Sequence, residues 1–410
     1  MKHRVVITGV GIVSSLGVGA DTVAAALRQG KSGIVVDRLR AEKGFLSPLT
    51  GRVPAYTPCF PLSRKQKKTL PEYGEWAVEA AFQAIADSGL DLADWQNPDS
   101  GLVFSNDSSS LAPLEQTAAL AEHGSTTGIG SGQIFRCMTS CITINLNVLL
   151  RTQGAAWTIG AACAGGGHAV GQAADLIRLG RQTRVLCGGA QEINFQSMCG
   201  FDGLGAFSRR VEAPEQACRP FDAGRDGLVP SGGAAALVLE DRDTALTRGA
   251  KIWGEVAGYG FSSDGHSLSM PGNHGLRRAM EKALADASFA AADVDYICAH
   301  ATSTPGGDAA EAKDIADLFG RGPAVSSTKS MTGHELWMSG AAQLVYSCLM
   351  AGHGFMAPNR NFVNGDGITD LIRVIPETVP EPPRKVLCNA AGFGGTNACL
   401  ALDFTDGRRP

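Results

Sequence analysis

Strand-like and helix-like segments alternate along most of this 410-residue chain. Runs typical of buried strands are "HRVVITG" at 3–9, "SGLVFS" at 100–105, "TRVLCGG" at 183–189, "AAALVLED" at 234–241, "VDYICAH" at 294–300 and "KVLCNAA" at 385–391. Helical apolar patterns lie between them, at 20–30, 75–89, 169–180, 275–287 and 309–320. This alternation predicts a layered α/β fold.

The composition excludes several classes of protein. A net charge of −4 argues against nucleic-acid binding, and no apolar run reaches the roughly 18 residues that a membrane span needs. The apolar start "MKHRVVITGVGIVSSLG" is β-branched and broken by glycines, so we expect a first strand and turn, not a secretory signal. Eleven scattered cysteines without a CxxC pair favour reduced thiols over a zinc site, and therefore a cytoplasmic protein.

A charged stretch divides the chain into two parts. It runs over 239–256, "LEDRDTALTRGAKIWGEV", and no low-complexity linker occurs elsewhere. We therefore expect an N-terminal lobe at 1–250 and a C-terminal lobe at 251–410.

Two short motifs invite interpretations that the surrounding sequence does not favour. Gly9 and Gly11 follow a strand, but Ser14 stands where a dinucleotide-binding fingerprint needs its third glycine, so a tight strand-to-helix turn is expected. Ser326 and Lys329 match S-x-x-K, yet the stretch reads as strand and loop and lacks the partner motifs of acyl-serine enzymes.

Cys163 stands between a strand and a helical pattern, within "TIGAACAGGG". A thiol near a helix N-terminus meets unpaired N–H groups and the positive end of the dipole, which lower its pKa. The small residues at 164–167 are expected to leave room for a substrate carbonyl to reach the N–H of Cys163. Taken alone, the cysteine is either a packed thiol or a nucleophile.

Two histidines strengthen the second interpretation. His300 directly follows a strand, and His334 comes five residues after Lys329 in a loop rich in Gly, Ser and Thr. Imidazole N–H groups are suited to stabilising an enolate or an oxyanion. Lys329 and Glu311 are candidates to set the electrostatics of the second histidine.

These segments together make the chain resemble the β-ketoacyl-acyl carrier protein synthases, most closely synthases I and II of dissociated fatty acid synthesis. The resemblance spans the whole chain and is carried by "ACA" around Cys163, "H-x-T-S-T-P-x-G-D" from His300, "KSMTGH" ending at His334, "FDAGRDG" at 221–227 and "GFGGTN" at 392–397. It implies the thiolase fold, an α/β architecture of two similar lobes in five layers, α-β-α-β-α, with a mixed five-stranded sheet in each lobe.

The resemblance also implies an acyltransferase reaction and assigns roles to residues. An acyl chain held on Cys163 condenses with malonyl-carrier protein, releasing CO₂ and free carrier, in fatty acid synthesis or a related polyketide or polyene pathway. His300 and His334 bind the malonyl thioester and assist decarboxylation, with Lys329 and Glu311 in support. The N–H groups of Cys163 and Phe393 form the oxyanion hole. Substrate-binding residues are Thr302, Thr304, Phe201 and Gly394.

The partners implied are an acidic acyl carrier protein, whose 4'-phosphopantetheine carries the substrates, and a second copy of the chain. A heterodimer with a chain-length factor is the alternative to a homodimer. No metal or bound cofactor is expected. A basic patch for the carrier is expected from Arg64, Lys65, Lys68, Arg209 and Arg210.

The chain departs from the family pattern close to these residues. "ELWMSG" at 335–340 replaces the usual small-residue run, so Glu335 is expected beside the His334 imidazole, where it would alter the protonation. Ala391 replaces a phenylalanine, Leu228 an aromatic residue, and "SNDSSS" at 105–110 a glycine-rich segment. These changes suggest an altered acyl-chain preference.

The sequence argues against two other classes of protein. A non-catalytic chain-length-factor-like partner would lack the cysteine. A thiolase would need a second cysteine in a CxGxG context, which neither Cys388 nor Cys399 has.

Overall fold

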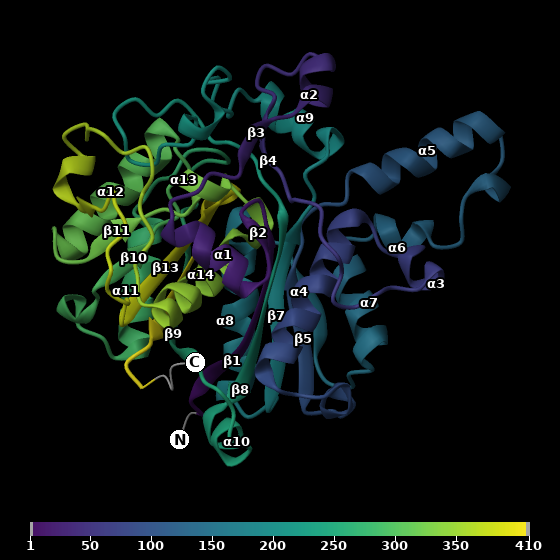
Figure 1. The fold of residues 1–410 in the computed structure, drawn as a ribbon, viewed down its shortest axis with the longest axis horizontal. Helices are drawn as coiled ribbons and strands as arrows, with labels where there is room; N and C mark the ends of the chain where they lie inside the picture. Colours follow the sequence, from purple (N-terminus) through teal and green to yellow (C-terminus); the bar gives the residue numbers. More distant parts are fainter. Residues whose placement is uncertain (1–2, 407–410) are drawn as a thin grey trace.

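Two five-stranded arrays with matching topology form the centre of the molecule, in a computed structural model that describes residues 3–406 (Figure 1). The first has the order β6 (Ala156–Ile159), β5 (Ser100–Ser105), β7 (Arg184–Gln191), β8 (Gly233–Asp241), β1 (Val5–Ser14). The second has the order β11 (Ala324–Ser326), β10 (Tyr296–Cys298), β13 (Lys385–Gly392), β14 (Thr396–Asp403), β9 (Gly254–Ser263). In each array the strand next to the junction pairs antiparallel and the two outer strands pair parallel.

The two arrays meet at a short junction. β1 and β9 pair through Val6↔Glu255 and Ile7↔Gly254, so that within residues 3–406 the arrays form one hydrogen-bonded sheet of 12 strands, including β2 (Gly17–Val18) and β12 (Arg373–Val374). A separate hairpin consists of β3 (Ile34–Val36) and β4 (Leu49–Gly51). The chain passes from one array to the other through α10 (Arg242–Thr247), and the boundary expected at residue 250 lies between this helix and β9.

The three largest apolar cores lie between five layers. The central core contains residues of both arrays together with α8 (Gly165–Arg178) and α14 (Ser339–His353). A second core packs α4 (Glu72–Ser88) and α7 (Cys141–Leu150) against the first array, and a third packs α11 (Gly275–Ala287) and α12 (Pro305–Phe319) against the second. The order is therefore helices, sheet, helices, sheet, helices, which is the five-layer order expected.

Seven further α-helices complete the set in the described chain. They are α1 (Ala20–Arg28), α2 (Arg38–Glu42), α3 (Arg64–Lys67), α5 (Leu111–His123), α6 (Gln133–Cys137), α9 (Phe195–Gly203) and α13 (Lys329–Thr332). Among them, α1 contributes to the central core. Figure 1 shows that α5 extends away from the body of the molecule. Along residues 3–406, no helix is both long and apolar enough to span a membrane.

The first glycines do not form the expected turn. Gly9 and Gly11 lie inside β1, which continues to Ser14. A Cβ atom on Gly9 would lie 2.0 Å from the Ala84 carbonyl oxygen, and one on Gly11 would lie 1.9 Å from that of Ala80. These glycines therefore let α4 approach the strand at backbone contact, which a sequence pattern cannot distinguish from a turn.

Substituting Gly11 by alanine is expected to destabilise the protein by about 1–3 kcal/mol, because the added methyl group overlaps the backbone of α4. Chemical denaturation measures this change. Gly200→Ala is the matched control, since a Cβ atom at this helical position meets nothing within 4 Å and alanine is the better helix former. Equal midpoints for the two variants would contradict the close approach of α4.

Candidate active site

Four loops from both arrays bring the predicted residues together. Cys163 lies in the 3₁₀ turn Ala162–Ala164 between β6 and α8, and His300 follows β10. His334 comes just after α13, and Phe393 begins the turn between β13 and β14. A cavity of about 520 Å³ is lined by these four residues.

The cysteine and the second histidine are in direct contact. Cys163 Sγ lies 3.2 Å from His334 Nε2, and His334 Nδ1 lies 3.2 Å from the hydroxyl of Ser339, the first residue of α14. This arrangement suits an imidazole that accepts the thiol proton at Nε2 and donates from Nδ1 to the serine. The centroids of the His300 and His334 rings are 5.3 Å apart, and the two rings are nearly perpendicular, at 87°. The sequence carried no signal for Ser339.

Burial affects the pKa of the Cys163 thiol more than the helix dipole does. It raises the pKa of Cys163 to about 12, although the charge of Lys329 and the backbone N–H groups of Cys163 and Phe393 favour the thiolate. The expected lowering of this pKa is therefore wrong for the resting protein, because desolvation outweighs the donors. These two N–H groups, which act on the sulfur, are the ones that the resemblance assigns to an oxyanion hole.

The two imidazoles are neutral at pH 7. Burial and the nearby Lys329 ammonium hold the pKa values of His300 and His334 well below the ordinary value. Lys329 itself is buried, and among residues 3–406 its Nζ has no hydrogen-bond partner. A neutral imidazole has one donor N–H and one acceptor nitrogen. His300 can donate its N–H to a developing anion, whereas His334, whose Nδ1 faces Ser339, carries an N–H at Nε2 once it has taken the proton of Cys163.

Glu311 acts on the first histidine, not on the second as expected. Its carboxylate accepts hydrogen bonds from the backbone N–H groups of His300 at 2.9 Å and Ala301 at 2.6 Å, and from Asn389 Nδ2 at 2.9 Å. Since Glu311 lies on α12, these contacts fix the loop after β10 to the helix that follows it.

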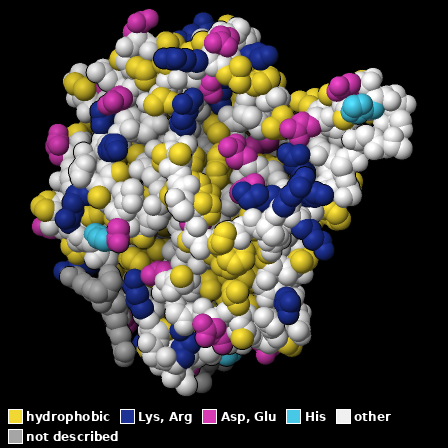
Figure 2. Space-filling view, turned by 45° about the vertical axis from the view of Figure 1, so that its right-hand side comes forward, with side chains coloured by type: hydrophobic (Ala, Val, Ile, Leu, Met, Phe, Trp, Pro, Cys, Tyr) yellow, Lys and Arg dark blue, Asp and Glu magenta, His cyan; other side chains and the backbone are white. Residues whose placement is uncertain are grey.

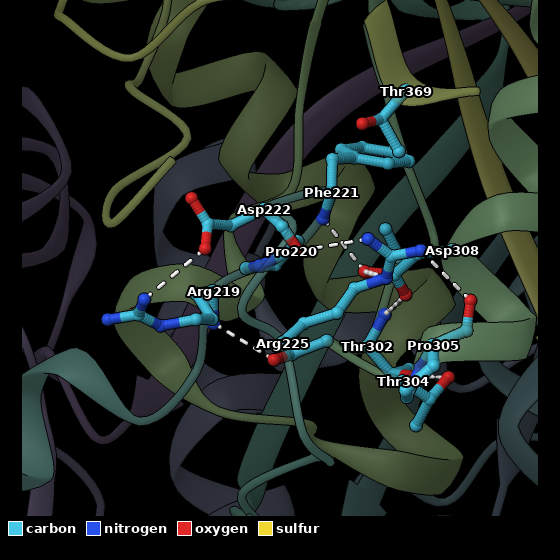
Figure 3. A network of polar contacts seen from close by, with 12 residues as sticks. Arg219, Pro220, Phe221, Asp222, Arg225, Thr302, Thr304, Pro305, Asp308 and Thr369 are labelled. Atoms are coloured by element: carbon cyan, nitrogen blue, oxygen red, sulfur yellow. Dashed lines mark hydrogen bonds and ion pairs between the residues drawn. The ribbon is translucent and has the colours of Figure 1, made fainter. Parts of the chain in front are cut away.

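The two threonines line the same cavity. Their hydroxyls are 3.1 Å apart, and the backbone N–H of Thr302 donates to Asp308 at 3.0 Å. Figure 3 shows Asp308 also accepting from the N–H of Phe221, at 2.8 Å, with Arg225 beside it. Arg225 lies 3.9 Å from Asp308 and forms an ion pair with Asp366 at 2.7 Å.

Asp308 and Arg225 were missed as site residues, although both stand in quoted motifs. Burial raises the pKa of Asp308 to about 7. Asp308 and Arg225 join the "FDAGRDG" loop to the loop that contains Thr302 and Thr304. An aspartate and an arginine in two separate motifs were the sequence signal that could have indicated this contact.

Aromatic rings form one side of the cavity. Phe201 lies 5.9 Å from Phe393 and 6.4 Å from Phe207 between ring centroids, and both pairs are nearly parallel. Gly394 does not line the cavity. Its N–H donates to the Leu268 carbonyl at 2.8 Å, and its φ of 75° is a backbone conformation that favours glycine.

The glycines after Cys163 pack helices and do not open space for substrate. Gly165, Gly166 and Gly167 are buried, and a Cβ atom on Gly166 would lie 2.8 Å from the Ala341 backbone nitrogen. Gly166 thus allows α14 to approach α8, whereas a Cβ atom on Gly165 would lie 2.2 Å from the Ser105 hydroxyl and one on Gly167 would lie 3.1 Å from Ala398 Cβ. None of the three glycines lines the cavity, so their expected role beside the carbonyl is wrong.

Glu335 does not contact the His334 ring as expected. It is buried, its Oε1 accepts from the Tyr346 hydroxyl at 2.5 Å, and burial raises its pKa to about 7. The His334 ring is instead held by Cys163 and Ser339. Ala391 and Leu228 both line the cavity.

The predicted basic patch lies outside the cavity. Arg64, Lys65, Lys68 and Arg209 are exposed, while Arg210 is half-buried and 3.6 Å from Asp226. Figure 2 shows Lys and Arg side chains gathered beside an apolar area, on the side where Figure 1 places α3, α6 and α7.

Residues 3–406 contain no cluster of three or more His, Cys, Asp or Glu side chains able to hold a metal ion. Cys388 and Cys399 are buried in β13 and β14 and do not line the cavity. They are therefore not placed to act as a second catalytic thiol.

Family models match both parts of the chain. The β-ketoacyl synthase N-terminal domain matches residues 2–245, and the β-ketoacyl synthase C-terminal domain matches residues 253–363. The chain belongs to the β-ketoacyl synthase family. It is 37% identical to 3-oxoacyl-[acyl-carrier-protein] synthase 1 of Escherichia coli K12, over 97% of this chain and 98% of that one.

Solved structures confirm the thiolase fold. A β-ketoacyl synthase from Burkholderia phymatum superposes with a TM-score of 0.91 at 33% identity, covering 99% of this chain and 100% of that one. A type II polyketide ketosynthase, AntDE, in complex with its acyl-carrier protein AntF and bound to the hexaketide, superposes with a TM-score of 0.89 at 28% identity, covering 99% and 100%.

The rate of Cys163 alkylation by iodoacetamide is expected to rise about tenfold per pH unit from pH 7 to 9, because the thiolate is a small fraction far below a pKa of about 12. Peptide mass spectrometry follows the modification, with the exposed Cys199 as an internal reference for reagent activity. A plateau below pH 8.5 would show that a thiolate–imidazolium pair already exists in the resting protein.

Proposed function

We propose that the protein is a β-ketoacyl-acyl carrier protein synthase that uses Cys163 as its nucleophile. The observation that carries this proposal is the 3.2 Å contact between Cys163 and His334, in a cavity that His300 also lines. In the first step the sulfur attacks an acyl-carrier thioester while His334 takes the thiol proton. The carrier leaves as a free thiol and takes up one proton from the solvent, the acyl group stays on Cys163, and His334 keeps the thiol proton at Nε2 for the next step.

In the second step malonyl-carrier protein enters the cavity. Its carboxylate leaves as CO₂, and the bonding electrons form an enolate whose oxygen accepts hydrogen bonds from His300 and His334. The enolate carbon attacks the Cys163 thioester. The N–H groups of Cys163 and Phe393 hold the tetrahedral oxyanion until the C–S bond breaks. The sulfur then leaves and takes back its proton from His334, and β-ketoacyl-carrier protein is released.

The cavity supports delivery of substrates on a phosphopantetheine arm. Thr302 and Thr304 offer hydroxyls to its amides, and the wall near Leu268 and Met270 is apolar. No metal or bound cofactor is needed for these steps. We propose that Lys329 tunes the histidines through its charge and that Glu311 positions the His300 loop.

The partner we propose is an acyl carrier protein attracted by Arg64, Lys65, Lys68, Arg209 and Arg210. Rim charges of this kind mainly speed association and make it sensitive to salt. The structural relative AntDE is itself bound to a carrier protein. For substrate binding, we propose that Phe201 acts directly from the cavity wall and that Gly394 acts indirectly, through the turn it forms beside Phe393.

A second copy of the chain is the proposed partner at β6. In the described chain this strand pairs with β5 alone, and its Trp157 is 43% exposed. Exposed apolar side chains also occur at Ile134, Phe135 and Val148. An uncharged edge strand beside apolar surface favours pairing with another chain. A heterodimer with a chain-length factor is the alternative.

The division into lobes at 1–250 and 251–410 stays a proposal, supported by the gap between the family models at 245 and 253. A cytoplasmic location is proposed because all eleven cysteines are free thiols. The catalytic set argues against a non-catalytic, chain-length-factor-like role.

His300→Ala is expected to lower condensation at least about 100-fold more than it lowers acylation of Cys163, because His300 contacts the enolate and not the thiol. Intact-mass measurement follows the acyl-enzyme, and chromatography follows β-ketoacyl-carrier formation from malonyl-carrier protein. His353→Ala, an exposed histidine, is the control. An equal loss in both steps would contradict the assigned role.

Trp157→Glu is expected to convert a dimer into a monomer in sedimentation velocity, since it places a charge on the free edge of β6. Leu179→Glu is the matched control, because this side chain is 71% exposed at the end of α8 and does not belong to the strand. A dimer that survives the Trp157 change would place the interface elsewhere.

A further inference from the structure

We infer that Trp337 ends the acyl pocket beyond Cys163 and restricts the enzyme to short acyl groups. This inference rests on the proposed function and names the substrate class of the same site. Trp337 stands in the departure "ELWMSG", three residues after His334.

The indole packs in the apolar cluster that surrounds the nucleophile. Trp337 is 8% exposed and belongs to one cluster with Cys163, Met198, Phe207, Leu228 and Leu336. Its ring lies 6.3 Å from that of Phe201 between centroids. A large rigid side chain therefore occupies the apolar volume next to the sulfur.

The cavity does not reach this ring. On the side of the nucleophile it is lined by Phe201, Leu204, Ala206, Leu228 and Leu336, whereas Trp337, Met198 and Phe207 of the same neighbourhood do not line it. An acyl chain on Cys163 would extend along Phe201 and Leu228. Its far end would then meet the layer that contains the indole.

Hydrogen bonds hold the indole in place. Its Nε1 donates to the Ser108 hydroxyl at 3.2 Å, and the Trp337 backbone N–H donates to Gln191 Oε1 at 3.4 Å. The side chain is thus tied to "SNDSSS", the second departure near the pocket. Moving it aside would break a partly buried hydrogen bond.

A polar layer follows behind the ring. The Ser108 hydroxyl donates to Glu192 Oε1 at 3.4 Å, and this buried carboxylate also accepts from the Ser110 N–H at 2.5 Å and from Asn194 Nδ2 at 2.9 Å. An alkyl chain that passed Trp337 would desolvate these groups without replacing their hydrogen bonds. Trp337 is therefore the last apolar position available to the chain end.

The test compares loading of Cys163 by butyryl-, octanoyl- and dodecanoyl-carrier proteins in the full-length wild type, Trp337→Ala and Trp337→Phe. In the wild type, dodecanoyl loading is expected to be at least tenfold slower than butyryl loading. A single methylene group too many in a closed apolar pocket already lowers the rate by about tenfold or more. Trp337→Ala is expected to raise the dodecanoyl-to-butyryl ratio at least tenfold, and Trp337→Phe to raise it less.

Trp95→Phe is the control, because this tryptophan is fully buried in another core. Its length profile is expected to match that of the wild type. Equal butyryl and dodecanoyl loading by the wild type would overturn the inference even if the alanine variant did not fold, and so would an unchanged ratio in a folded variant. Absence of any adduct on Cys163 with all three chains would instead refute the proposed function.

Discussion

Backbone contact between α8 and α14 is the constraint on which the rest of the structure depends. A Cβ atom on Gly340 would lie 2.2 Å from the Gly167 backbone nitrogen, so only glycine permits this approach. α8 begins just after Cys163, and α14 begins at Ser339, which holds the His334 ring. Packing the two helix starts together therefore sets the distance between the sulfur and the imidazole, although 171 positions separate the two residues in the chain.

The same burial decides the charge state of the site. Desolvation favours the neutral thiol at Cys163 and neutral rings at His300 and His334, and the buried Lys329 lies close enough for its charge to act on all three groups. Charge would then appear in the cavity only when a substrate reacts. Donors that are already in place stabilise such a charge most effectively, because no reorganisation is needed at that moment.

The departures from the family pattern are coupled in space. Trp337 from the segment after His334 contacts Ser108 from the segment after β5, and Ser108 contacts Glu192 after β7. Three segments far apart in the chain thus build one wall. Glu335, in contrast, points to Tyr346 and leaves the imidazole to Ser339. A side chain that is adjacent to His334 in the sequence therefore need not contact the His334 ring in the structure.

The sequence by itself determined the elements and the chemical groups. Periodicity alone predicted α11 at Gly275–Ala287 and most of α4, and residue type and spacing made Cys163, His300 and His334 candidates, because helix period and residue type are local properties. Phe393 became a candidate only through the family resemblance. Only the tertiary structure decided that Gly9 and Gly11 admit a helix, that Glu311 holds His300, and that the Cys163 thiol stays protonated. Each of these depends on which atoms surround a group after packing, and neither burial nor contact between distant segments is encoded in a local pattern.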